Sequence, residues 1–265
     1  MNRRHFLQGA GILLTGGSSL DREARASSQS ERRVLITSGE TELAQVIADH
    51  LSRDRGVRLT GLTAVPSRFP FTACQLDHDS ATDELVQGVE AIVHVAEPPA
   101  GADEREQIDH LTRRTYNLAR AAVDAGVDRL LFLSTLELMT GYEEDFLVSE
   151  RWRPLPTTRP SVLAKHLGEY TCREFAREQK LQVIVLRLGK VIKAAAVKGQ
   201  AADPLWVEER EVAQAVAGAL DAKLSDHAQG VGRWRIFHVQ SEFPGSRFPV
   251  ANAKGALGYR PSFRP

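Results

Sequence analysis

Two residues near the middle of the chain combine a hydroxyl and an amine at helical spacing. Ser161 and Lys165 lie four residues apart in a segment with helical periodicity, so one helical turn would bring their side chains together. A serine activated by a lysine is the nucleophile of one class of hydrolases. Nothing in the sequence marks an oxyanion hole, which argues against hydrolysis.

Two other side chains near this pair could exchange protons. His166 adjoins Lys165, but neighbouring helical residues point roughly 100° apart, so His166 is a poor partner for the lysine. Tyr142 follows a predicted strand, and we interpret it as a tyrosine of a surface loop. Lys165 itself has two interpretations, an amine of a binding site or a solvated lysine on a helix surface.

A short polar segment with a single glycine follows the first apolar strand of the chain. It reads Thr37-Ser38-Gly39-Glu40-Thr41-Glu42-Leu43-Ala44. A turn that leads into a helix N-terminus can bind phosphate through its backbone N–H groups. Glu40 and Glu42 would oppose an anion there, whereas Ser38 or Thr41 could cap the helix with acids in its first turn. A phosphate site and a capped helix therefore both remain open.

An alternation of short apolar strands and amphipathic helices must position these residues. Strands are expected at residues 34–37, 57–60, 71–76, 91–95, 130–134, 183–186 and 235–239. Helices are expected at residues 43–51, 82–87, 103–125, 160–178, 207–222 and 249–257. Continuous apolar runs bounded by turns indicate strands buried on both faces. The order predicts an α/β fold, a doubly wound parallel sheet of Rossmann type with a small C-terminal substrate subdomain.

This order of segments resembles the extended short-chain dehydrogenase/reductases, the NAD-dependent epimerase/dehydratase group. The resemblance spans residues 33–265 and is carried by residues 34–37, 88–96, 125–135, 206–215 and 248–261. It implies one NAD(P)-binding domain over residues 33–265. It also implies an oxidoreductase or epimerase-like enzyme that acts on a small polar or sugar-like substrate.

The resemblance implies a catalytic set and a cofactor-binding set. In the first, Thr135 would orient the substrate, Lys165 would hold the nicotinamide ribose, and Ser161 stands where the family has its tyrosine. An aliphatic hydroxyl ionises far above the phenol's pKa of about 10, so Ser161 would not act as the base at neutral pH. The cofactor-binding residues would be Ser38, Gly39, Thr41, Leu43, Gln75, Ala96 and Lys165.

The nucleotide-binding end departs from the family pattern. Of the glycines in the family's TGGxGxxG loop only Gly39 is retained, and Thr41 adds a Cβ where the backbone would approach the pyrophosphate. The second strand ends at residues 61–65 without an acid for a ribose hydroxyl, and Arg68 lies a few residues further on. These residues favour neither NAD nor NADP. Two functions follow: a nucleotide-binding, epimerase-like protein with altered catalytic residues, or a non-catalytic ligand-binding or interaction protein that retains the fold.

Composition argues against several partner classes. Lys+Arg and Asp+Glu both number 34, and a chain without net charge lacks the basic excess that nucleic-acid binding needs. No run of about 18 apolar residues occurs, so no membrane-spanning helix is expected in the mature chain. Cys74 and Cys172 have neither redox-motif nor metal-ligand spacing, and we expect two buried or unpaired thiols and no metal site.

The N-terminal segment resembles a bacterial twin-arginine export signal. Arg3 and Arg4 precede an apolar stretch at residues 6–14, and residues 24–26 form a small-x-small cleavage site. We expect a signal peptide at residues 1–26, a linker at 27–32, and export of the folded chain to the periplasm. The alternative is a basic N-terminus that stays attached.

Overall fold

A seven-stranded parallel sheet forms the centre of the protein in the computed structural model, which describes residues 33–224 and 233–264. The predicted signal peptide and linker lie outside these residues. The strand order is β3-β2-β1-β4-β5-β6-β9, and every pairing is parallel. The strands are β1 (Arg33–Ile36), β2 (Gly56–Gly61), β3 (Phe71–Ala73), β4 (Ala91–His94), β5 (Arg129–Thr135), β6 (Gln182–Leu188) and β9 (Trp234–Val239). The doubly wound parallel fold predicted from the sequence is confirmed.

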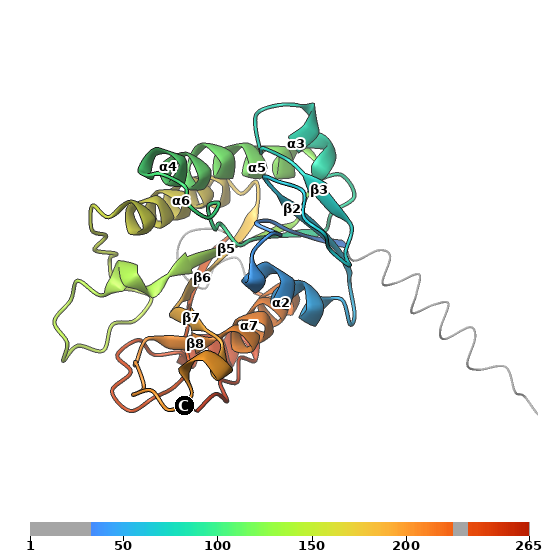
Figure 1. Cartoon of the computed structure of the whole chain (residues 1–265). Coiled ribbons are helices and arrows are strands. Elements are labelled where there is room, and N and C mark those ends of the chain that lie inside the picture. Colours follow the sequence, from blue (N-terminus) through green and yellow to red (C-terminus); the bar gives the residue numbers. More distant parts are fainter. Residues whose placement is uncertain (1–32, 225–232, 265) are drawn as a thin grey trace, which may run out of the picture.

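Helices cover both faces of this sheet (Figure 1). One layer contains α3 (Ser80–Leu85), α4 (Glu104–Leu111), α5 (Arg113–Asp124) and α6 (Pro160–Arg177). The other contains α2 (Glu42–Leu51), α7 (Glu209–Asp221) and α8 (Ala251–Leu257). Because side chains alternate along a strand, Val34 and Ile36 pack with the second layer while Leu35 packs with the first. Both faces of β1 are therefore apolar.

The structure differs from the expected elements in two respects: one long helix is divided, and four short elements are added. The helix expected at residues 103–125 is two helices that meet at Thr112, whose hydroxyl donates to the carbonyl of Ile108 at 2.6 Å. Several short elements were not expected: β7 (Lys190–Ile192), β8 (Trp206–Glu208), η1 (Leu136–Met139) and η2 (Ala194–Val197). Strands β7 and β8 pair as a separate two-stranded sheet, and three residues are too few to give a periodic pattern.

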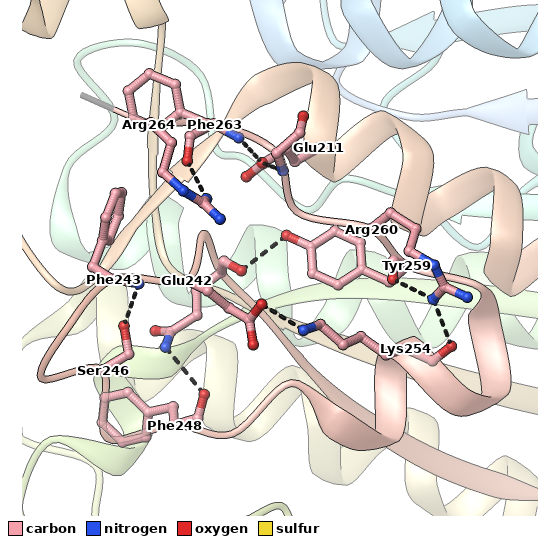
Figure 2. Close-up of polar contacts among 12 residues, drawn as sticks. Glu211, Glu242, Phe243, Ser246, Phe248, Lys254, Tyr259, Arg260, Phe263 and Arg264 are labelled. Atoms are coloured by element: carbon pink, nitrogen blue, oxygen red, sulfur yellow. Dashed lines mark hydrogen bonds and ion pairs between the residues drawn. The ribbon is translucent and has the colours of Figure 1, made fainter.

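The C-terminal segment is fastened to α7 and to the end of β9 (Figure 2). The buried carboxylate of Glu211 accepts hydrogen bonds from the backbone N–H groups of Ser262 and Phe263 at 2.5 and 2.6 Å. The buried Tyr259 donates its hydroxyl to the carbonyl of Gln240 at 3.0 Å. These bonds join the predicted C-terminal part to the main core.

Two smaller expectations concern thiols and membrane spans. Cys74 and Cys172 are both free and buried, as predicted. Burial raises the pKa of the Cys172 thiol, which keeps it protonated at neutral pH. Within the described residues, no helix combines the length and the apolarity that a membrane span requires.

The close approach of α6 to the sheet depends on Gly168. A Cβ at this position would lie 2.6 Å from Cζ of Phe132 and 2.8 Å from the carbonyl oxygen of Leu111. We expect Gly168→Ala to lower the free energy of unfolding by about 1–3 kcal/mol, because the added methyl overpacks the contact. Urea denaturation of the full chain measures this.

The matched control is Gly255→Ala in α8, where an added Cβ would meet nothing within 4 Å. Alanine is the better helix former, so we expect this variant to gain about 0.5–1 kcal/mol. A Gly168→Ala protein as stable as the parent would contradict the packing described for α6.

Candidate functional site

The candidate site lies at the carboxyl ends of the central strands. The strand order reverses between β1 and β4, because β2 and β3 lie beyond β1 while β5 and β6 lie beyond β4. In open parallel sheets, ligands bind in the crevice at such a reversal. The loops that leave β1 and β4 therefore border the crevice where a ligand is expected to bind.

Ser38 ties these two loops together. Its hydroxyl donates to the carbonyl of Glu97 at 2.9 Å and accepts from the N–H of the same residue at 3.2 Å. Ser38 has a φ of 52° and Ala96 a φ of 57°, a left-handed conformation that normally favours glycine. The two hydrogen bonds help to hold a serine where the family pattern has a glycine.

Thr41 caps helix α2. Its hydroxyl donates to the carbonyl of Ser38 at 2.8 Å and accepts from the N–H of Ala44 at 3.3 Å, and its φ is −86°. The prediction that Thr41 could cap this helix is therefore confirmed. Leu43, the next predicted cofactor residue, lies in the first turn of α2 and is half-buried against the core.

Gly39 is retained for packing against the neighbouring strands. A Cβ there would lie 2.8 Å from Cε2 of Phe71 and 2.9 Å from Cβ of Leu59. Its N–H donates to the carbonyl of Thr60 at 2.8 Å. The backbone after β1 is thereby pressed against the end of β2.

The side chain of Glu40 lies over the end of β2. The sequence did not indicate this position. A Cβ at Gly61 would overlap Oε2 of Glu40, so the carboxylate rests directly on this glycine. Glu42 instead points to the surface and pairs with Lys193 at 2.7 Å. The two acids of the loop therefore have different surroundings.

Lys165 of α6 is buried and reaches the carboxyl ends of β4 and β5. Its Nζ donates to the carbonyl of Leu133 at 2.8 Å and to that of Val95 at 3.2 Å. Oε1 of Glu97 lies 3.6 Å from the same nitrogen. Burial lowers the pKa of the ammonium, and the nearby Glu97 carboxylate partly offsets this effect. The interpretation of Lys165 as a solvated surface lysine is wrong.

The other two predicted catalytic residues are not joined to Lys165 by hydrogen bonds. Ser161 is exposed in the first turn of α6, directly after Pro160 at the helix start. Thr135 ends β5 and accepts the N–H of Glu137 at 3.1 Å, which caps η1. A Ser–Lys nucleophile gains no support, because the ammonium of Lys165 donates to the backbone carbonyls of Val95 and Leu133.

The remaining candidates have structural partners. Tyr142 donates its hydroxyl to the carbonyl of Arg153 at 2.5 Å, and the ring of His166 packs against Tyr170 with centroids 4.9 Å apart. Gln75 is exposed and donates to the carbonyl of Leu62 at 2.9 Å, which joins the loops after β2 and β3. Arg68 pairs with Asp49 of α2.

A buried polar network beneath the crevice was also missed from the sequence. Nδ1 of His94 lies 2.8 Å from the hydroxyl of Thr37, and Nε2 lies 2.9 Å from the hydroxyl of Thr115. Burial, and next the neighbouring His110, hold the pKa of His94 well below its usual value, so its imidazole is neutral. In the sequence, a histidine within an apolar strand could have indicated this network. Glu97 could have been found as a site residue because it is an acid just beyond the end of β4.

This arrangement can bind and orient a polar ligand. Lys165, at the ends of β4 and β5, has one N–H beyond the two that it donates to carbonyls, and the Glu97 carboxylate lies 3.6 Å from its nitrogen. The Glu40 carboxylate offers an acceptor over the end of β2. Ser161, which stands where the family resemblance places a tyrosine, is exposed in the first turn of α6.

Several known proteins resemble this chain. An NAD-dependent glucose-6-phosphate dehydrogenase of Haloferax volcanii is 23% identical over 261 residues, covering 87% of this chain and 93% of that protein. An L-arabinose 1-dehydrogenase (NAD(P)(+)) of the same organism is 24% identical over 264 residues, covering 86% and 96%. Among solved structures, a uronate dehydrogenase from Agrobacterium tumefaciens, a tyrosine-to-alanine mutant complexed with NAD, has a TM-score of 0.73 at 19% identity. That alignment covers 88% of this chain and 85% of the uronate dehydrogenase.

The family itself is identified by a model that spans most of the domain. The model of the NAD dependent epimerase/dehydratase family matches residues 33–202, which include the β1 loop, the end of β4 and Lys165. The alignments with the two Haloferax volcanii dehydrogenases also cover most of the length of those proteins. The chain belongs to the NAD dependent epimerase/dehydratase family.

Proposed function

We propose that this protein binds a nicotinamide dinucleotide at the crevice between β1 and β4, and that its catalytic residues are altered from those of its family. The observation that carries the proposal is the buried ammonium of Lys165 at the carboxyl ends of β4 and β5. An amine held at this point can donate to a ribose hydroxyl of a dinucleotide in the crevice. The uronate dehydrogenase mutant in complex with NAD supports the same ligand class.

The residues fit such a ligand at its two riboses. At one end Lys165 offers its ammonium, and at the other Oε2 of Glu40 is buried without a hydrogen-bond partner among the described residues. Between them, Thr41 adds a side chain to the loop that the diphosphate would approach, although the N-terminus of α2 still favours an anion. The diphosphate would therefore lie above a capped helix rather than against glycine.

The chemistry supported by these residues is binding and orientation. A bound nicotinamide ring would supply a hydride acceptor or donor. Thr135 accepts a backbone hydrogen bond at Oγ1, which leaves its hydroxyl hydrogen for a substrate oxygen. Ser161 is exposed and its hydroxyl is too weak an acid to replace a phenol, so we expect proton transfer to be slow at neutral pH.

Relatives that act on sugars support a sugar-like substrate. The similar proteins include dehydrogenases of glucose-6-phosphate, L-arabinose and uronate. We propose a small polyhydroxyl compound as the substrate class. The exposure of Ser161 favours the second candidate function, a non-catalytic protein that binds such a ligand and does not turn it over.

Replacement of the buried amine tests the proposed site. We expect Lys165→Met to weaken NADH binding by about tenfold or more, because a hydrogen bond from a charged group contributes about 1.5–3 kcal/mol. The measurement is NADH fluorescence in a titration of the full chain, with circular dichroism to check that the variant folds. The matched control is Lys180→Met, which removes an exposed lysine that pairs with Glu178. Equal affinity of the Lys165 variant and the parent would contradict the proposed site.

We also propose export through the twin-arginine pathway, supported by the Arg3-Arg4 pair and the residues that follow it. In a bacterium with this pathway, the periplasmic fraction should contain a chain that begins at Ser27, identified by mass spectrometry. Arg3→Lys combined with Arg4→Lys should leave the uncleaved chain in the cytoplasm. An unchanged distribution of the double variant would contradict the proposal.

A further inference from the structure

The end of β2 lacks an acid of its own, but the loop after β1 brings one there. Residues 61–65 contain no carboxylate, whereas the side chain of Glu40 folds back onto Gly61. A Cβ at position 61 would overlap Oε2 of Glu40 and lie 2.8 Å from its Cδ. The hydrogen bond from Gly39 N–H to the carbonyl of Thr60, at 2.8 Å, fixes the backbone just before Glu40.

This carboxylate oxygen lacks a donor. Oε2 of Glu40 is buried, yet none of the described residues donates a hydrogen bond to it. A buried carboxylate oxygen without a donor is unfavourable, so the arrangement suits a ligand that brings one. The neighbouring Glu42, which pairs with Lys193 at the surface, has no such need.

The space beside Glu40 limits the size of that donor. The hollow is lined by Thr60, Gly61, Leu62 and Cys74 together with residues of the β1 loop, and its volume is about 10 Å³. This is the room of roughly one water molecule. A hydroxyl fits this space.

The charges around Glu40 also favour a hydroxyl over a phosphate group. The nearest arginine that the sequence offered for a 2′-phosphate, Arg68, pairs with Asp49 of α2. Glu40 and Glu42 both add negative charge to the loop, and a carboxylate repels a phosphate dianion.

We infer that Glu40 selects the nucleotide: its carboxylate accepts a hydrogen bond from the adenosine ribose 2′-hydroxyl of NAD and excludes the 2′-phosphate of NADP. This inference rests on the proposed function, because it concerns the other end of the same dinucleotide. It assigns the role of the absent β2 acid to a residue of the β1 loop.

The test compares dissociation constants for NADH and NADPH, measured by nucleotide fluorescence on the full chain. The parent should bind NADH at least about tenfold more tightly than NADPH, the ratio expected from one charge-assisted hydrogen bond. Glu40→Gln should weaken NADH binding and reduce the ratio to below about three, since the amide no longer repels phosphate. Glu42→Gln removes the same charge two residues away and should keep the parental ratio.

A second variant separates position from charge. Gly61→Ala displaces the Glu40 carboxylate while the charge remains, and it should weaken NADH binding as Glu40→Gln does. A parental ratio retained by Glu40→Gln, with both nucleotides still bound, would overturn the assignment of Glu40 and leave the proposed function standing. Absence of binding of either nucleotide to the parent would overturn the proposed function, and this inference with it.

Discussion

The buried ammonium of Lys165 is the interaction on which the rest of the site depends. A charge removed from water needs acceptors, and here two strand-end carbonyls and the Glu97 carboxylate supply them. The amine can reach them only because α6 lies close to β5, which Gly168 allows one turn further along the helix. Next to Gly168, Glu169 accepts two hydrogen bonds from the buried Arg187 of β6, at 2.9 and 2.7 Å, and this second ion pair holds the same helix to the sheet.

The loops at the strand ends are ordered by the same neighbourhood. Glu97, whose carboxylate faces Lys165, also exchanges two backbone hydrogen bonds with the hydroxyl of Ser38. The β1 and β4 loops therefore form one connected unit with the amine. Such a preformed site favours ligand binding, because little conformational entropy has to be lost when the ligand enters.

The sequence predicted the elements well because each one has a local pattern. The parallel strands are continuous apolar runs, and the helices carry apolar residues at regular spacing, so both were expected close to their observed bounds. Thr135 was expected after the fifth strand, and Lys165 on a helix at the nicotinamide ribose, through the family resemblance. The break at Thr112 was not expected, since a single threonine within a long periodic segment gives little warning.

What the sequence did not predict depends on contacts between distant segments. The carboxylate of Glu40 was expected only to oppose an anion, yet it rests on Gly61, which belongs to another strand. The bond between Ser38 and Glu97 joins residues 59 positions apart, and no local pattern encodes it. The solvated interpretation of Lys165 failed for the same reason, because its acceptors lie 32 and 70 positions away in the chain.

Hydrogen–deuterium exchange of the full chain, with and without NAD, tests the central claim most directly. We expect NAD to slow exchange in the loops that contain residues 37–44 and 95–97, on either side of the strand reversal, and to leave exchange at the opposite edge of the sheet unchanged. Unchanged exchange in both loops at saturating NAD, or protection confined to another region, would contradict a dinucleotide site built around Lys165.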